Sequence, residues 1–183
     1  MAVLVEAISI IIRRKTIDNK YPGGWDSFVR DAPNGSLCAD EKIARVGFMS
    51  PVDVESFIKE LEKLGFIYLV DGNTSEIAVI DQIKGYMMPC DWLDAGHVEI
   101  NNGLHKVAAC KLKKCQLEYI IFPEGWDYDQ SLSRAYAFVP SEHVDKSLKY
   151  LRHENGLDVY LNLLTNEEVY IGRTDVTLED RED

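Results

Sequence analysis

The first apolar stretch of the chain, Ala2–Ile12, predicts a strand that is buried on both faces. Its apolar residues occupy odd and even positions alike, which is typical of a central strand covered on two sides. Tyr21–Gly24 then carries proline and glycine and predicts a break, and Trp25–Arg30 predicts a short helix or turn. Two more short strands are expected at Leu37–Asp40 and Ala44–Phe48.

The clearest predicted element is a helix that begins after Ser50. Ser50 is a good N-cap, and Pro51 suits the first helical position. Gly65 is typical of the residue that follows a helix. The apolar residues between them recur at helical spacing: Val54, Phe57, Ile58, Leu61 and Leu64. We therefore expect an amphipathic helix with one face packed on a sheet.

Two hairpins are predicted, one in each half of the chain. The first joins strands at Phe66–Val70 and Glu76–Ile83 through the turn residues Asp71–Thr74. The second joins strands at Leu157–Leu163 and Glu168–Arg173. In both hairpins, β-branched and aromatic residues flank polar turn residues, as the pairing of short strands requires.

A second helix is expected before the later hairpin, capped by Ser141 and ending near Asn155. Its apolar stripe contains Val144, Leu148 and Leu151. The two halves also share a Pro-x-Gly-Trp-Asp motif, at Pro22–Asp26 and at Pro123–Asp127. We interpret this shared order as a degenerate internal duplication. The alternative is two ordinary α+β segments that share a tryptophan turn by chance.

These patterns predict an α+β fold of two pseudo-repeated βαββ-like units, with largely antiparallel sheets and one main helix packed on each. The first unit is expected at residues 1–84 and the second at 97–178, with a connecting loop at 85–96. An acidic tail follows at 179–183. One compact pseudo-symmetric domain is the alternative arrangement.

The charge balance narrows the partners that we expect. The chain of 183 residues has 20 Lys and Arg against 31 Asp and Glu, a net charge of −11. This acidity disfavours binding to a nucleic-acid backbone and favours a basic protein partner. No stretch approaches the length of a membrane-spanning helix, and the basic residues near the N-terminus follow the apolar run instead of preceding it, unlike those of a secretory signal.

The cysteines agree with a cytoplasmic location. The chain has four, at Cys38, Cys90, Cys110 and Cys115, and none forms a C-x-x-C pair. They are too sparse for a disulfide scaffold, so we expect reduced thiols that are mostly buried.

Two regions are candidates for a functional site. A basic partner would be met by acidic and aromatic residues around the second tryptophan motif and in the middle of the chain, namely Asp91, Trp92, Asp94, Trp126, Asp127, Tyr128 and Asp129. An enzyme or ligand-binding protein would instead have its site in a cleft between the two units. The candidates for that cleft are Asp91, Asp94, His97 and Glu99.

No metal ion or other cofactor is predicted. The residues that could form a metal site are His97, Glu99, His105, Cys110 and Cys115. They flank an expected hairpin turn at Asn102 and Gly103, and a two-residue turn there places Glu99 opposite Lys106 and Ile100 opposite His105. His97 and Glu99 then point away from His105. A three-residue turn would bring Glu99 opposite His105, but we prefer the first register because it pairs Glu99 with Lys106.

The sequence therefore favours a non-catalytic protein that docks a basic partner, as an immunity or inhibitor protein does. Nucleotide-binding, serine-hydrolase and zinc-protease motifs are missing from it. The alternative is a small enzyme or ligand-binding protein with its site in the cleft. A third possibility is a homo-oligomer that pairs through a sheet edge. The sequence does not identify a partner or a substrate.

Overall fold

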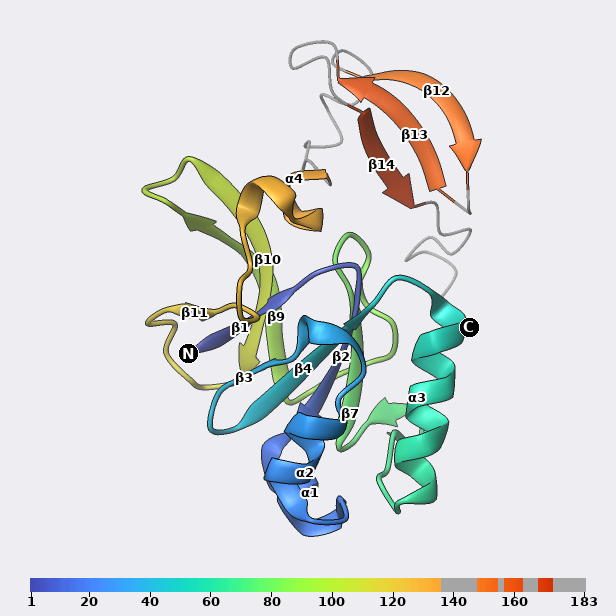
Figure 1. Ribbon diagram of the computed structural model, residues 1–183, viewed down its shortest axis with the longest axis vertical. Coiled ribbons are helices and arrows are strands. Elements are labelled where there is room, and N and C mark those ends of the chain that lie inside the picture. The colour runs from blue at the N-terminus through green and yellow to red at the C-terminus, as the bar shows by residue number, and fades with distance from the viewer. Residues whose placement is uncertain (136–147, 155–156, 163–167, 173–183) are drawn as a thin grey trace. The chain divides into compact units, whose positions relative to one another are not determined.

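The computed structural model describes residues 1–135, 148–154, 157–162 and 168–172 (Figure 1). The chain divides into two compact units, Met1–Asp127 and Tyr128–Asp183. The described residues have a mixed α+β structure with mostly antiparallel sheets, which confirms the predicted class. Within them, no helix has the length and apolar character needed to cross a membrane.

The first unit is built around a five-stranded antiparallel sheet with the order β3-β4-β2-β7-β8. Its strands are β2 (Ile8–Arg13), β3 (Cys38–Ala39), β4 (Ile43–Phe48), β7 (Ile77–Asp81) and β8 (Gly85–Tyr86). The central strand β2 pairs with β4 on one side and with β7 on the other. The short strands predicted around residues 38 and 45 are confirmed.

Helices cover one face of this sheet: α1 (Arg14–Lys20), α2 (Gly24–Asp31) and α3 (Pro51–Lys63). Their buried side chains share one core with β2, β4 and β7, and this core contains Ile10, Ile12, Ile17, Phe28, Val46, Val54, Ile58, Leu61 and Val79. The predicted helix after Ser50 is confirmed, with the Ser50 side chain accepting a hydrogen bond from the Val52 amide. Between α2 and β3 the chain forms a short 3₁₀ turn, η1 (Asn34–Ser36).

A second, four-stranded sheet has the order β11-β1-β10-β9. Its strands are β1 (Ala2–Val5), β9 (Leu93–Ile100), β10 (His105–Leu112) and β11 (Ile120–Ile121), and only β1 and β11 run parallel. The β9–β10 hairpin has the preferred register, with Glu99 opposite Lys106 and Ile100 opposite His105. Residues 85–96, where we expected a connecting loop, contain β8 and the first residues of β9.

The prediction of one continuous strand from Ala2 to Ile12 is wrong. The chain bends at Glu6 and Ala7, where Ala7 has a φ of 49°, and it passes from the four-stranded sheet into the five-stranded sheet. Both strands are buried on two faces, so the apolar pattern continues through the bend and hides it. The bend brings β1 into contact with β3 and β4.

The first predicted hairpin is shorter than expected. Strand β5 (Leu69–Val70) pairs with β6 (Asn73–Thr74) across Asp71 and Gly72, whose positive φ angles of 49° and 77° suit a two-residue turn. The following strand, β7, pairs with β2 instead, because that position buries both of its faces.

The second unit contains η2 (Tyr128–Gln130), α4 (Leu132–Ala135) and an antiparallel sheet of β12 (Leu148–Glu154), β13 (Leu157–Asn162) and β14 (Glu168–Gly172). The predicted second hairpin is confirmed as β13 and β14. The second helix is wrong at residues 148–154, which form β12, and its earlier part at 141–147 lies outside the described residues, as does the tail at 179–183.

The pairing of β12 explains why helical spacing misled here. Tyr150 lies opposite Tyr160 with the ring centres 5.5 Å apart, and Arg152 makes two 2.9 Å hydrogen bonds to Glu168. These contacts stabilise a strand, and tertiary pairing of this kind overrides a short apolar spacing. The internal duplication, which needs a helix at these residues, is not confirmed.

Candidate functional site

A buried polar network joins the two sheets of the first unit at the bend between β1 and β2. Arg45 of β4 is only 2% exposed, and its Nε donates to Ser9 Oγ at 2.9 Å. Its Nη1 donates to the Ser36 carbonyl at 2.9 Å and its Nη2 to the Glu6 carbonyl at 2.8 Å. Burial lowers the pKa of Arg45 from its ordinary value, and these hydrogen bonds offset part of that cost. The network fixes the bend and therefore the relative placement of β1 and β2.

At the bend itself, Gln82 makes two hydrogen bonds to the backbone of Ala7. The Gln82 amide N–H donates to the Ala7 carbonyl at 2.8 Å, and the Ala7 N–H donates to Gln82 Oε1 at 2.9 Å. A backbone N–H can only donate, so the side-chain oxygen must face Ala7 and the side-chain Nε2 must face away from it. This Nε2 is buried and has no hydrogen-bond partner in the part of the chain that the structure describes.

Gln82 lines a pocket of about 300 Å³, which we call the His97 pocket. The pocket lies between the segment that links β7 to β8 and the strands β9 and β10. Its apolar lining includes Val5, Ile80 and Ala108, and its polar lining includes Asp81, Gln82, Lys84 and His97. A concave site with a few polar groups on an apolar surface is the usual form of a small-molecule site.

The polar groups of the His97 pocket differ in what they can offer a ligand. Burial, with a smaller contribution from Lys106, lowers the pKa of His97, so its imidazole is neutral at neutral pH. The Tyr86 hydroxyl donates to the Leu93 carbonyl at 2.7 Å, and burial raises the pKa of this phenol. The residues that line the pocket therefore include an amide, a neutral imidazole, the ammonium group of Lys84 and the carboxylate of Asp81.

Of the four residues predicted for a cleft site, only His97 lines this pocket. Asp94 points to the opposite face of β9 because it lies three positions away, and it pairs with Lys111 at 2.8 Å. Asp91 is exposed just before β9, and Glu99 is exposed opposite Lys106. The four residues that the sequence assigned to one cleft therefore lie in different environments.

The residues predicted for partner docking fall into different environments. Trp92 is only 6% exposed, with the guanidinium carbon of Arg13 4.1 Å from its ring centre, so Asp91 and Asp94 are the exposed members of that group. Trp126 is half-buried, stacks on Phe122 and donates to Glu6 Oε1 at 3.1 Å.

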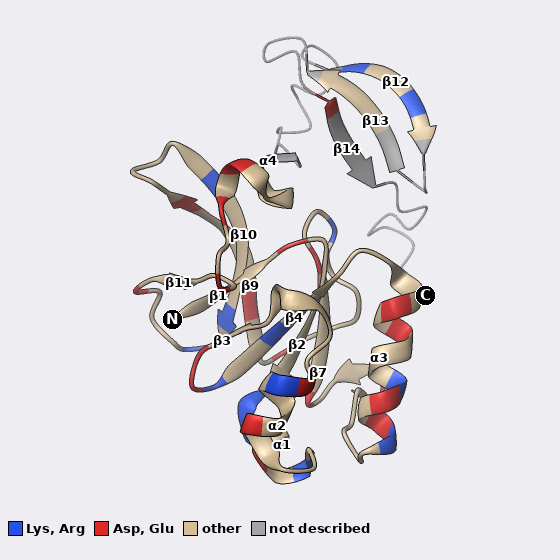
Figure 2. Cartoon of the chain, viewed as in Figure 1, with Lys and Arg blue, Asp and Glu red and all other residues tan. Residues whose placement is uncertain are grey.

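The remaining docking candidates, Asp127, Tyr128 and Asp129, lie at the boundary between the two units, Asp127 in the first and the other two in the second. Asp127 and Asp129 are exposed, whereas Tyr128 is half-buried. Elsewhere in the first unit, acidic residues are interspersed with lysines along α3, so that helix carries no uniformly acidic face (Figure 2). Docking of a basic partner stays a prediction.

The four thiols fall into two pairs. Cys38 and Cys110 are buried, and burial raises the pKa of Cys38 to about 11. Cys90 and Cys115 are partly exposed, and all four are free. Among the described residues, no three His, Cys, Asp or Glu side chains are grouped to hold a metal ion.

Two of the residues that shape this region were not singled out from the sequence. Arg45 is the one charged residue in the apolar run Ile43–Phe48, and a lone cation in such a run is a signal of a buried, hydrogen-bonded group. Gln82 carries no comparable signal, because its role depends on a bend that the sequence pattern hides.

A scan against protein-family models, a search of curated proteins and a search of solved structures each found no match.

Proposed function

We propose that the first unit binds a small organic ligand in the His97 pocket. The observation that carries this proposal is that Gln82 lines a pocket of about 300 Å³ and has a buried Nε2, a hydrogen-bond donor without an acceptor among the described residues. A buried donor left unpaired costs about 1–3 kcal/mol. A ligand whose acceptor reaches this Nε2, by a small rotation of the Gln82 side chain, recovers that cost, so we expect ligand binding to be favourable.

The lining limits the chemical class of this ligand. Gln82 requires a hydrogen-bond acceptor such as a carbonyl or carboxylate oxygen, and Lys84 favours a negative charge that Asp81, in the same lining, opposes. Val5, Ile80 and Ala108 favour a short apolar portion. The volume lies at the small end of the range of roughly 300–1,000 Å³ that is usual for ligand sites. We therefore expect a short carboxylate or amide with an apolar chain.

The non-catalytic docking of a basic protein remains a separate prediction, supported by the net charge of −11. It does not conflict with a ligand in the His97 pocket. The pocket itself is compatible with an enzyme or with a binding protein, since a neutral imidazole can accept a proton or a hydrogen bond.

An NMR fragment screen tests the proposed function. The ligands are carboxylates, primary amides and neutral alcohols of about four to eight carbon atoms, a size chosen for a small pocket. Binding should shift the backbone amides of Ile80–Tyr86 and Ala95–His97, two of the segments that line the pocket, and should favour carboxylates and amides over alcohols.

Two variants make the screen specific to the pocket. Ala95 is an exposed residue that lines the pocket, so Ala95→Leu fills the space without disturbing the core and should abolish the shifts. Glu99→Leu adds a similar apolar side chain further along β9, outside the pocket, and should leave the shifts unchanged. Equal binding to the wild type and to Ala95→Leu would refute the proposal.

A further inference from the structure

A second pocket of the first unit is basic although the chain as a whole is strongly acidic. It has a volume of about 390 Å³ and is lined by four cations, Arg13, Lys15, Lys20 and Lys42, and by two carboxylates, Glu41 and Glu76. We call it the basic pocket. Its cations come from the end of β2, from α1 and from the residue just before β4, so the fold gathers them from separate segments.

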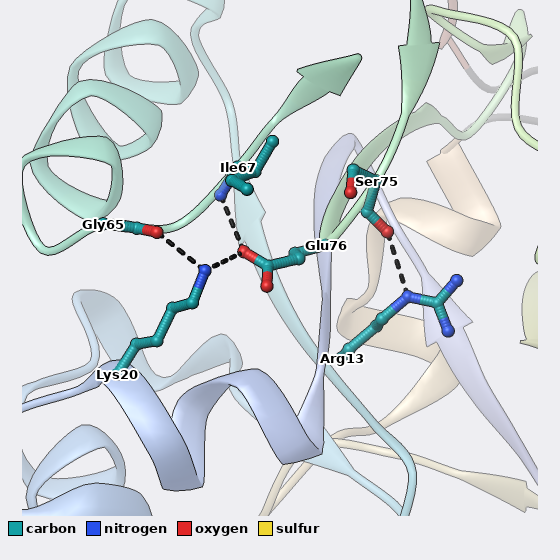
Figure 3. Close-up of polar contacts among 6 residues, drawn as sticks. All are labelled: Arg13, Lys20, Gly65, Ile67, Ser75 and Glu76. Atoms are coloured by element: carbon teal, nitrogen blue, oxygen red, sulfur yellow. Dashed lines mark hydrogen bonds and ion pairs between the residues drawn. The ribbon is translucent and has the colours of Figure 1, made fainter.

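One pair in this pocket is internally neutral. Lys20 Nζ donates to Glu76 Oε2 and to the Gly65 carbonyl, both at 2.8 Å (Figure 3). The same carboxylate oxygen accepts the amide N–H of Ile67 at 2.8 Å. These contacts tie α1 to the chain that follows α3. Lys20 and Glu76 therefore stabilise the fold and cancel each other's charge.

Arg13 has no such partner. Its Nε donates to the Ser75 carbonyl at 2.9 Å, and its guanidinium lies against the ring of Trp92. In the described chain, no carboxylate pairs with it and no acceptor meets its two terminal nitrogens, which point away from Ser75 in Figure 3. The side chain is half-buried and held from two sides. It thus presents two parallel N–H groups in a fixed position, the geometry that binds a phosphate or carboxylate with two hydrogen bonds.

Two lysines add to the positive charge that Arg13 brings to the basic pocket. Lys15 is exposed and has no ion-pair partner within the described residues. Lys42 Nζ lies 3.2 Å from Cys115 Sγ, and sulfur is only a weak acceptor. Of the two carboxylates that line the pocket, Glu76 is already neutralised by Lys20, so Glu41 opposes these three cations, and Asp40, outside the lining, also acts on Lys42. A concave surface with such a surplus concentrates small anions.

We infer that the basic pocket binds a phosphate-type dianion, either free phosphate or the phosphate of a monoester, with Arg13 making the two-pronged contact and Lys15 and Lys42 at its sides. This site uses none of the residues named for the His97 pocket. An experiment that refutes one of the two proposals therefore leaves the other untouched.

The test titrates the full chain with inorganic phosphate at low ionic strength and follows backbone amides by NMR. The amides of Arg13–Lys20 and of Lys42 should shift together and saturate. The double variant Lys15→Gln/Lys42→Gln removes two exposed charges and should weaken binding by roughly tenfold. The matched control Lys59→Gln/Lys63→Gln removes two exposed charges from α3 and should leave the affinity unchanged.

Arg13→Lys provides the second arm, because it keeps the positive charge and loses the two-pronged geometry. It should weaken phosphate binding while leaving the shifts caused by chloride at the same ionic strength unchanged. Equal losses in the pocket variant and the α3 control would show a general counter-ion effect and overturn the inference. Shifts that never saturate, or that chloride reproduces, would overturn it as well. A monoester probe, glycerol phosphate, then distinguishes the source: tighter binding than that of free phosphate assigns the site to a monoester.

Discussion

Gly47 is the residue whose replacement tests the buried Arg45 network most sharply. A Cβ atom at this position would lie 2.4 Å from Arg45 Nη2 and 2.7 Å from its Cζ, closer than atoms can approach. Gly47 itself is fixed, since its amide donates to Ser36 Oγ at 2.8 Å and its carbonyl accepts from Asn34 Nδ2 at 2.9 Å. Gly47→Ala must therefore displace the guanidinium.

The cost follows from the bonds that the guanidinium would lose. A hydrogen bond to a charged group contributes about 1.5–3 kcal/mol, and displacement removes the Nη2 bond and weakens the other two. Alanine in a strand regains about 0.5–1 kcal/mol relative to glycine. We expect Gly47→Ala to lower the free energy of unfolding by about 2–4 kcal/mol.

Urea unfolding followed by tryptophan fluorescence is the assay. All three tryptophans, Trp25, Trp92 and Trp126, lie in the first unit, so the signal reports that unit alone. The decisive comparison is a double-mutant cycle with Arg45→Ala, in which the obstacle is gone and Gly47→Ala should cost less than about 0.5 kcal/mol. An equal cost in both backgrounds would refute the reasoning, because the guanidinium would then not be what excludes a side chain.

Two further predictions concern titration and reactivity. Because folding lowers the pKa of His97, the contribution of this residue to stability is full above the unfolded pKa of about 6.5 and is lost as the pH falls. Between about pH 7.5 and 5.5, the free energy of unfolding should therefore fall more for the wild type than for His97→Gln. Equal decreases in the two proteins would contradict this prediction. In the native protein, iodoacetamide should label Cys90 and Cys115 well before Cys38 and Cys110, as peptide mass spectrometry would show; early labelling of Cys38 would contradict its burial.

Local signals in the sequence were sufficient where one segment decides its own structure. Ser50, Pro51 and Gly65 define the ends of α3, and its apolar stripe fixes the face that packs on the sheet. The β9–β10 register followed from the pairing of Glu99 with Lys106. In both cases the deciding residues lie within the segment whose structure they determine.

The sequence was insufficient where distant segments decide the structure. The bend at Ala7 is held by Gln82 and Arg45, and no pattern within Ala2–Ile12 marks it. The spacing of Leu148 and Leu151 fits a helix, but pairing with β13 makes this segment a strand. The candidate site shows the same limit, because His97 was identified but Gln82, which lines the same pocket, comes from the turn between β7 and β8.

The side-chain amide of Gln82 offers the most direct test of the ligand proposal. Its Nε2–H₂ resonances can be followed by NMR while a short carboxylate, butyrate, is added at millimolar concentration. The proposal predicts that these resonances move downfield in step with the backbone amide of His97, because the ligand oxygen becomes the missing acceptor. If the amides of the pocket shift while the Gln82 side chain stays unchanged, or if nothing shifts for any carboxylate or amide, the proposed site is wrong.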